Sequence, residues 1–356
     1  MVILPSVVFI SLFFSLVARA PVRTSWSASP PLPPGWRDPR RLKLLRRFAA
    51  FFVDDRYFFP ESDDGLWLQA DEGLNRGDNI LPYTEMEELE RCDSCQEDAA
   101  ALFEWSHESG LVDDDSIFTF ETNLCVVPFI TCVRLTEVLA DGGPREGYMV
   151  VLTPDDNFMA LSDVPQILWR RGQKPLVFSP SFYRLRHMAC FLAHNMPMQG
   201  SLGDDIAKLT SLRVIYMLGA ENSTTMDKLE GPLPATIGEL PYLKGLYMIL
   251  MPSMSGVIPP SLFSLSRLEA LQLSNTGLSV SIPGYIGRFQ RLRVLVINSN
   301  NRWEQGFPVS VMSCRNLTRL SLRGHALVGP LPDNLGALSR LDWLDLSDNK
   351  LSGELP

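Results

Sequence analysis

The chain has 356 residues, of which 46% are hydrophobic, and a formal net charge of −9 at pH 7. That charge is uneven, because residues 1–50 hold eight Lys or Arg against one Asp, residues 51–165 hold 27 Asp or Glu against five Arg, and residues 166–356 hold 19 basic against 13 acidic side chains. An acidic stretch of this strength argues against a nucleic-acid partner, since it repels phosphates.

Residues 1–20 have the pattern of a signal peptide. An apolar run extends from Val2 to Val17 and precedes Ala18-Arg-Ala20, an A-x-A cleavage pattern. The run is short for a membrane span, which needs about 20 residues. No Lys or Arg precedes it and several follow it, which by the positive-inside rule favours an uncleaved anchor with the body in the cytosol. The pattern predicts secretion, and a membrane-anchored intracellular scaffold is the alternative.

Residues 21–50 are rich in proline and then basic, and we expect a linker or a pro-segment. Two arginine pairs, Arg40-Arg41 and Arg46-Arg47, are candidate processing sites. The string RRLK in this segment approximates an R-x-L-R translocation motif but has the wrong fourth residue. Residues 46–59, RRFAAFFVDDRYFF, have the pattern of a short amphipathic helix.

Residues 51–180 form an acidic region in which we expect the cap of the domain that follows. A helical pattern, AALFEWSHESG, covers residues 100–110. The C-x-x-C formed by Cys92 and Cys95 has neither the second pair of a zinc site nor a thioredoxin-like context. A local disulfide and two free thiols both remain open. Two further cysteines, Cys125 and Cys132, have six residues between them.

Catalytic and metal-binding motifs are missing from the sequence. The four histidines, His107, His187, His194 and His325, lie in no ligand or nucleophile motif, and there is no phosphate-binding glycine loop. The acidic runs 113–115 and 155–157 lack the glycine and distal glutamate of a calcium loop, so we expect a solvated acidic surface. The sequence predicts no enzyme activity, no cofactor and no metal.

The C-terminal half repeats itself with a fixed period. Its equivalent apolar positions are spaced by 31, 25, 24, 25, 24 and 24 residues, a period typical of stacked supersecondary units. These positions are Leu202, Leu233, Ile258, Ile282, Phe307, Leu331 and Leu355. In the clearest unit, residues 329–352, Leu344 and Leu346 alternate as in a short strand with one buried face. Such a unit buries too little apolar surface to fold alone and must stack on neighbours.

These units resemble plant-type leucine-rich repeat proteins, with the pattern L-x-x-L-x-x-L-x-L-x-x-N-x-L-x-G-x-I-P, from about Leu185 to Pro356. We expect the repeat array to cover residues 181–356. The resemblance implies an α/β right-handed solenoid with parallel strands on its concave face and short 3₁₀ turns on its convex face. It also implies that Cys125 and Cys132 form the disulfide of an N-terminal cap, although the usual Trp and Gly between them are absent. Cys190 and Cys314 lie within repeats and are expected to be buried and unpaired.

Several repeats depart from the pattern. The asparagine, which in the family bonds backbone groups of adjacent coils, is kept at Asn300 and Asn349 but replaced by Thr276 and His325. We therefore expect an interrupted ladder. An insertion at residues 218–230 contains the glycosylation sequon of Asn222, and the sequon of Asn316 lies on a convex turn where a glycan would project freely.

Function is expected on the concave face, where the side chains flanking each buried pair of leucines point outward. The first repeats offer tyrosines, expected to be exposed, and the later ones offer an arginine stripe beside a tryptophan. Trp, Tyr and Arg dominate binding hot spots. The predicted ligand-binding residues are Tyr216, Tyr247, Gln272, Arg293, Val296, Arg319, Ser321, Arg323, Trp343 and Asp345.

The sequence thus predicts a secreted or cell-surface binding protein that recognises a protein, a peptide or a cell-wall glycan. The resemblance implies a receptor-kinase ectodomain or a polygalacturonase-inhibiting protein as the nearest role. We expect a fragment of a longer receptor, because the last repeat stops at Pro356 with its leucines open. A self-contained secreted inhibitor or effector is the alternative.

Overall fold

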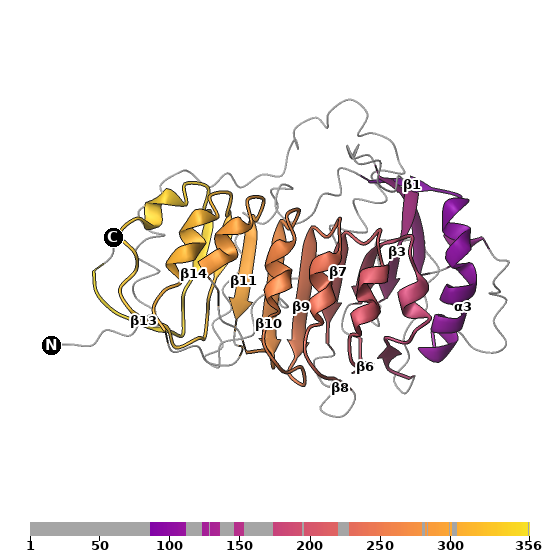
Figure 1. Cartoon of the computed structure of the whole chain (residues 1–356), viewed down its shortest axis with the longest axis horizontal. Coiled ribbons are helices and arrows are strands. Elements are labelled where there is room, and N and C mark those ends of the chain that lie inside the picture. The colour runs from indigo at the N-terminus through magenta and orange to yellow at the C-terminus, as the bar shows by residue number, and fades with distance from the viewer. Residues whose placement is uncertain are drawn as a thin grey trace, which may run out of the picture.

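The computed structural model describes residues 86–111, 123–127, 129–135, 146–152, 174–193, 196–219, 228–279, 282, 284–298, 300, 305–354 and 356. Its main feature is a sheet of ten strands in the order β1-β2-β3-β5-β7-β9-β10-β11-β12-β14. From β3 onward the neighbouring strands are parallel and follow chain order. Figure 1 shows the strands side by side along the molecule, with a row of 3₁₀ helices on the other side. The predicted solenoid class is confirmed.

Each coil contributes one strand to the long sheet and one 3₁₀ helix to the convex side. The strands are β5 (Met188–Ala193), β7 (Val214–Leu218), β9 (Gly245–Met251), β10 (Ala270–Thr276), β11 (Val294–Asn298), β12 (Arg319–Ser321) and β14 (Trp343–Asp345). The 3₁₀ helices are η7 (Phe182–Arg184), η8 (Asp204–Lys208), η9 (Ala235–Glu239), η10 (Pro260–Ser264), η11 (Gly284–Arg288), η12 (Val309–Ser313) and η13 (Leu335–Ala337). The coil of η7 and β5 is the first of these coils along the chain.

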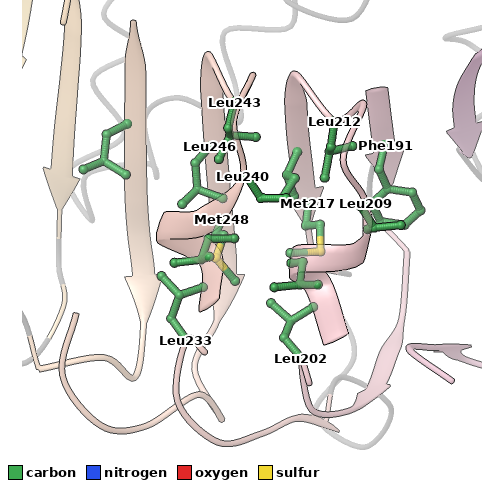
Figure 2. Packing of buried hydrophobic residues seen from close by; sticks show 14 of the residues in the cluster. Phe191, Leu202, Leu209, Leu212, Met217, Leu233, Leu240, Leu243, Leu246 and Met248 are labelled. Carbon is green, nitrogen blue, oxygen red and sulfur yellow. The ribbon is translucent and has the colours of Figure 1, made fainter. Parts of the chain in front are cut away.

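The solenoid interior is a continuous apolar core. In β9 the alternate residues Leu246 and Met248 point into it and are fully buried. Figure 2 shows them packed beside Leu240, Leu243 and the equivalent residues of the neighbouring coil. Each fully buried side chain of this size contributes roughly 1.5 to 3 kcal/mol, so coils stabilise one another through this shared interior.

Two small sheets pair short strands of some neighbouring coils along one edge of the solenoid (Figure 1). One contains the parallel strands β4 (Leu176–Val177), β6 (Met198–Gly200) and β8 (Lys228–Leu229), and the other contains β13 (Val328–Gly329) and β15 (Lys350–Leu351). Their spacing follows the repeat, so they extend the hydrogen bonding between coils beyond the long sheet.

The acidic region caps the first coil with strands that the sequence did not predict. They are β1 (Met86–Leu89), β2 (Ile130–Leu135) and β3 (Glu146–Leu152), and they pair antiparallel with one another. The expected helix is present as α3 (Ala99–Glu108), preceded by η4 (Ser94–Asp98), and η5 (Leu124–Val126) precedes β2. Strand β3 pairs parallel with β5 and joins the cap to the repeats. The expected helix at residues 46–59 lies outside the described residues.

The asparagine ladder is only partly interrupted. Nδ2 of Asn300 donates to Leu273 O at 2.9 Å and Nδ2 of Asn349 donates to Leu322 O at 2.7 Å. Nε2 of His325 lies 2.7 Å from Ile297 O, the equivalent carbonyl of the preceding coil. Because a carbonyl only accepts, Nε2 must carry the proton. Our expectation of a break at this residue was wrong, since an imidazole N–H replaces the amide.

At Thr276 the ladder does change. The hydroxyl and the backbone N–H of Thr276 donate to Oδ1 of Asn300, at 2.7 and 2.9 Å. The threonine side chain therefore bonds to the following coil, because it is too short to reach back to the preceding one. Because Nδ2 of Asn300 also donates to Leu273 O, these bonds join the same two coils and their contact is kept.

The His325→Ala substitution is expected to lower the free energy of unfolding by about 2 to 4 kcal/mol, through a cavity and an unpaired carbonyl. His325→Asn restores the ladder donor and should cost less than half as much. Burial lowers the pKa of His325, so its neutral form stabilises the fold above the unfolded pKa of about 6.5, and that contribution is lost as the pH falls. Urea denaturation at pH 7.5 and pH 5 checks both effects, and equal losses for the two variants would contradict the ladder role.

Candidate ligand-binding face

The strand register brings eight of the ten predicted ligand-binding residues onto one face, whereas Arg293 precedes β11 and Arg323 follows β12. Parallel pairing aligns equivalent residues of neighbouring strands in rows that run along the solenoid. The central row contains Tyr216, Tyr247, Gln272, Val296, Ser321 and Asp345. The row beside it contains Val214, Gly245, Ala270, Val294, Arg319 and Trp343. These side chains lie on the opposite side of the sheet from the interior core, so the predicted orientation toward the concave face agrees with the register.

The first part of this face is an apolar cluster, separate from the solenoid core. We call it the concave apolar cluster. It contains Val133, Leu135, Met149, Ala189, Cys190, Leu192, Val214, Tyr216, Leu218, Tyr247, Ile249, Ala270, Val294 and Val296, all at most 7% exposed. The rings of Tyr216 and Tyr247 are 5.9 Å apart between centroids. Burial raises the pKa of Tyr247 well above its usual range.

The expected exposure of the two tyrosines is wrong. Tyr216 and Tyr247 are each 1% exposed. Burying side chains of this size is favoured by the hydrophobic effect, whereas strand register indicates only the direction in which a side chain points. The concave apolar cluster is therefore closed to solvent in this structure.

Basic side chains border the concave apolar cluster at the start of two strands. Arg213 and Lys244 are each 2% exposed although both are basic. The guanidinium carbon of Arg213 lies 5.6 Å from the ring centroid of Tyr242, and that of Arg267 lies 5.2 Å from the same ring. Cation–π contacts of this kind favour a desolvated arginine, so the tyrosine between the two arginines stabilises this edge.

The later strands make the same face polar. Ser321 donates its hydroxyl to Oδ1 of Asn298 at 2.6 Å, and the Arg323 backbone N–H donates to the same oxygen at 3.1 Å. The Arg323 side chain forms an ion pair with Asp348 at 2.7 Å between Nε and Oδ2. Arg323, one of the arginines in the predicted stripe, therefore has its charge partly neutralised by Asp348. Arg293, Arg319 and Trp343 are half-buried on this part of the face.

Two polar side chains of the face are buried without hydrogen bonds. Within the described part of the chain, neither polar atom of the Gln272 amide nor the hydroxyl of Ser274 has a partner. Gln272 is 1% and Ser274 is 7% exposed. Leaving a buried polar group unpaired costs about 1 to 3 kcal/mol, and more than nine in ten are paired in folded proteins. The centre of the face therefore carries a local energetic cost.

Other predicted site residues lie elsewhere. Asn222 is outside the described residues. Asn316 does not project freely, because Nδ2 donates to Gln290 O at 2.6 Å and Oδ1 accepts from Nη1 of Arg340 at 2.9 Å. An inter-coil contact thus holds the sequon side chain. Sequence patterns could not reveal this contact, which depends on how the coils stack.

Two pairs of cysteines lie at disulfide distance, the pair that the family resemblance implied and the C-x-x-C pair, for which a disulfide and free thiols were both open. The sulfur atoms of Cys125 and Cys132 lie at bonding distance with Cα atoms 5.2 Å apart, and those of Cys92 and Cys95 lie likewise with Cα atoms 5.3 Å apart. Cys190 and Cys314 are buried and unpaired, as predicted. Burial raises the pKa of Cys190 to about 12 and that of Cys314 to about 11, so both thiols are protonated near neutral pH.

One polar centre at the junction of cap and repeats was missed by the sequence analysis. Asp98, 3% exposed, accepts hydrogen bonds from the Tyr148 hydroxyl at 2.9 Å and from the His187 backbone N–H at 2.7 Å. Nδ1 of His187 lies 3.1 Å from the other carboxylate oxygen. Tyr148 belongs to β3 and His187 to the turn before β5. A single buried carboxylate therefore joins the cap helix to the first coil.

Comparison with known proteins agrees with this geometry. A family model described as Leucine Rich Repeat matches residues 340–356. Receptor-like protein 35 of Arabidopsis thaliana is 36% identical over 145 residues, which are 40% of this chain and 15% of that protein. Receptor-like protein 39 of the same plant is 30% identical over 215 residues, 49% of this chain and 24% of that protein. The chain thus spans a quarter or less of the length of these relatives.

A solved structure extends the similarity to the cap. The complex of the Arabidopsis receptor kinase HAESA with the peptide hormone IDA and the co-receptor SERK1 is similar with a TM-score of 0.54 and 25% identity, over 73% of this chain and 39% of that chain. The fold is that of a solenoid repeat protein. The chain is a leucine-rich repeat protein of the plant type.

No helix among the described residues is long and apolar enough to cross a membrane. In the same part of the chain, no group of three or more His, Cys, Asp or Glu is placed to hold a metal ion.

Proposed function

We propose that this chain is an extracellular recognition module that binds a peptide or a protein through its concave strand face. The observation that carries the proposal is the register, which aligns aromatic, aliphatic and arginine side chains in rows across six strands. A stacked array holds these rows rigidly, so little entropy is lost when a ligand binds. No catalytic role is assigned to this chain.

The relatives support this proposal. Two are receptor-like proteins, and the HAESA structure is a complex with a peptide hormone and a co-receptor. By analogy, this chain is part of the ligand-binding ectodomain of a receptor-like protein or a receptor kinase. A solenoid fold alone does not determine function, so the face residues must be tested directly.

A peptide library tests the proposed face. We would select random linear dodecapeptides, displayed on phage, against the full chain secreted from eukaryotic cells. Trp343→Ala and Arg319→Ala on the concave face should each weaken the selected peptides at least about tenfold, as hot-spot residues do. The matched control Arg315→Ala removes an exposed arginine beyond η12 and should change affinity less than about twofold. Equal effects of the concave and control variants, or no selected peptide, would contradict the proposal.

Secretion is part of the same proposal. The A-x-A site after residue 20, the two cysteine pairs and the sequons of Asn222 and Asn316 support an oxidising, glycosylating route. A glycan on Nδ2 of Asn316 leaves one hydrogen on that nitrogen, so its bond to Gln290 can persist. Secretion predicts an N-terminus at Pro21 and a mass that falls after glycosidase treatment, whereas an intact Met1 without glycan contradicts it.

Cap stability gives a second test of the compartment. Under oxidising conditions, Cys125→Ser is expected to lower the free energy of unfolding by about 2.5 kcal/mol, because the loop between Cys125 and Cys132 is no longer closed in the unfolded state. With a reductant present, wild type and variant should unfold at nearly the same urea concentration. A difference that persists unchanged after reduction would show that packing, not the bond, is responsible.

A further inference from the structure

We infer that Gln272 and Ser274 form an amide-reading subsite, which pairs with a backbone peptide group of the ligand. This inference rests on the proposed function. It begins from the unpaired atoms in the middle of the face: Oε1 and Nε2 of Gln272 and Oγ of Ser274 are buried, and within the described residues none has a hydrogen-bond partner. Neighbouring polar residues do find partners, since Asn298 accepts from Ser321 at 2.6 Å.

The chemistry of this pair matches a peptide group. A glutamine amide offers one carbonyl acceptor and two N–H donors, and a serine hydroxyl offers one donor and two lone pairs. A peptide group offers one N–H and one carbonyl. Gln272 can therefore accept from the ligand N–H and donate to the ligand carbonyl, while Ser274, two residues along the same side of β10, remains available for the next group.

The surroundings favour a peptide over a glycan. In the strand register Gln272 lies between Tyr247 and Val296, and Ser274 lies between Ile249 and Asn298. Three of these four neighbours are apolar or aromatic and buried. A sugar carries hydroxyls on every side and would leave many of them unpaired here. A peptide with one apolar side chain next to an accessible backbone amide would satisfy both kinds of neighbour.

Burial of the subsite defines how a ligand would bind. Gln272 is 1% exposed, so its amide must become accessible before a ligand can pair with it. The closed face leaves three polar atoms unpaired, and a peptide that pairs them gains an interaction that the closed face lacks. A ligand shifts an equilibrium only by such differential contacts. The subsite thus favours the open, peptide-bound arrangement and discriminates against apolar ligands without a free amide.

The first test needs no ligand. Gln272→Leu replaces the amide by an apolar side chain of similar size, so thermal unfolding should occur at the same or a higher temperature than in wild type. The matched control Gln290→Leu removes an exposed glutamine whose Nε2 donates to Gly287 O, and it should be neutral or slightly destabilising. A clear fall in the melting temperature of Gln272→Leu would show that its amide has a structural role and would overturn the inference.

The second test uses the phage-selected dodecapeptides, made synthetically and N-methylated at one backbone nitrogen at a time. Methylation at one position should weaken binding to the wild-type protein at least about tenfold. Gln272→Leu should bind the unmethylated peptide at least about tenfold more weakly than wild type does, and the same methylation should not weaken its binding further. Peptides that bind wild type and Gln272→Leu equally would overturn the subsite and leave the proposed function standing. Failure to select any peptide would overturn both. Binding to plant cell-wall oligosaccharides that Gln272→Leu abolishes would refute the peptide assignment.

Discussion

Replacing Asp98 by alanine should lower the free energy of unfolding by about 3 to 5 kcal/mol, the cost of breaking a buried, hydrogen-bonded charged group. The substitution removes the acceptor for the fully buried Tyr148 hydroxyl and for the His187 backbone N–H. Each of these donors would then be left without its partner. The cap strands should separate from the first coil, which would also disturb the adjoining end of the concave apolar cluster, where Met149 of β3 packs.

The effect has a pH signature that packing alone would not give. The hydrogen bond to Asp98 raises the pKa of His187, with Glu97 acting in the same direction and partial burial and Arg186 opposing it. A raised pKa in the folded state means that the stabilisation is complete below the unfolded value of about 6.5 and is lost as the pH rises through the folded value. Wild type should therefore lose this contribution as the pH rises above about 6.5, whereas Asp98→Ala should not show that loss.

Urea denaturation across this pH range measures both effects. The matched control is Glu104→Ala on α3, the helix that follows Asp98, which removes a surface ion pair with Arg184 at 2.7 Å. Both of those side chains are about half exposed, so the control should cost less than about 1 kcal/mol. If Asp98→Ala were no more destabilising than the control, or if its pH profile matched wild type, the carboxylate would not hold the cap.

The repeats could be predicted because each coil carries its own local signal. Leu344 and Leu346 alternate as strand residues, and the same spacing returns every 24 or 25 residues, so period and register followed from the sequence. The register then identified which residues of each strand point to the concave face. The imidazole at His325 shows the limit of this approach, because a consensus position names a residue type, whereas the contact requires only an N–H that reaches the carbonyl of Ile297.

The cap and the burial of the face depend on long-range contacts. Asp98 and His187 are 89 residues apart, and their contact exists only because β3 pairs with β5. Strand β3 lies in the acidic region, where no repeating sequence pattern indicates a strand. Equally, whether Tyr247 is exposed depends on what packs over the sheet, which periodicity does not record. Sequence therefore predicted the array and its orientation, but not its junction with the cap or the closure of the face.

Gly277→Ala should be among the most damaging substitutions within the repeats, with an expected loss of about 3 kcal/mol or more. A Cβ at this position would lie 2.5 Å from Pro252 O and closer still to Met254 O. Both are backbone atoms of the preceding coil, so no side chain can rotate away, and the two coils must separate. Overpacking usually costs about 1 to 3 kcal/mol, and here it also strains the hydrogen bond from the Gly277 N–H to Met251 O at 3.2 Å.

In a stacked array, stability is close to a sum of coil and interface contributions. A weakened interface between β9 and β10 should therefore broaden the unfolding transition and lower the urea dependence of the free energy of unfolding. Gly336→Ala is the matched control, because its Cβ would have no atom within 4 Å, and it should change stability by less than about 0.5 kcal/mol. Peptides that contact both Tyr247 and Gln272 should bind Gly277→Ala more weakly, since the row that presents these side chains crosses the strained interface. A cooperative transition with wild-type midpoint and slope would mean that the backbone absorbs the added methyl group and that close coil spacing does not hold this row in place.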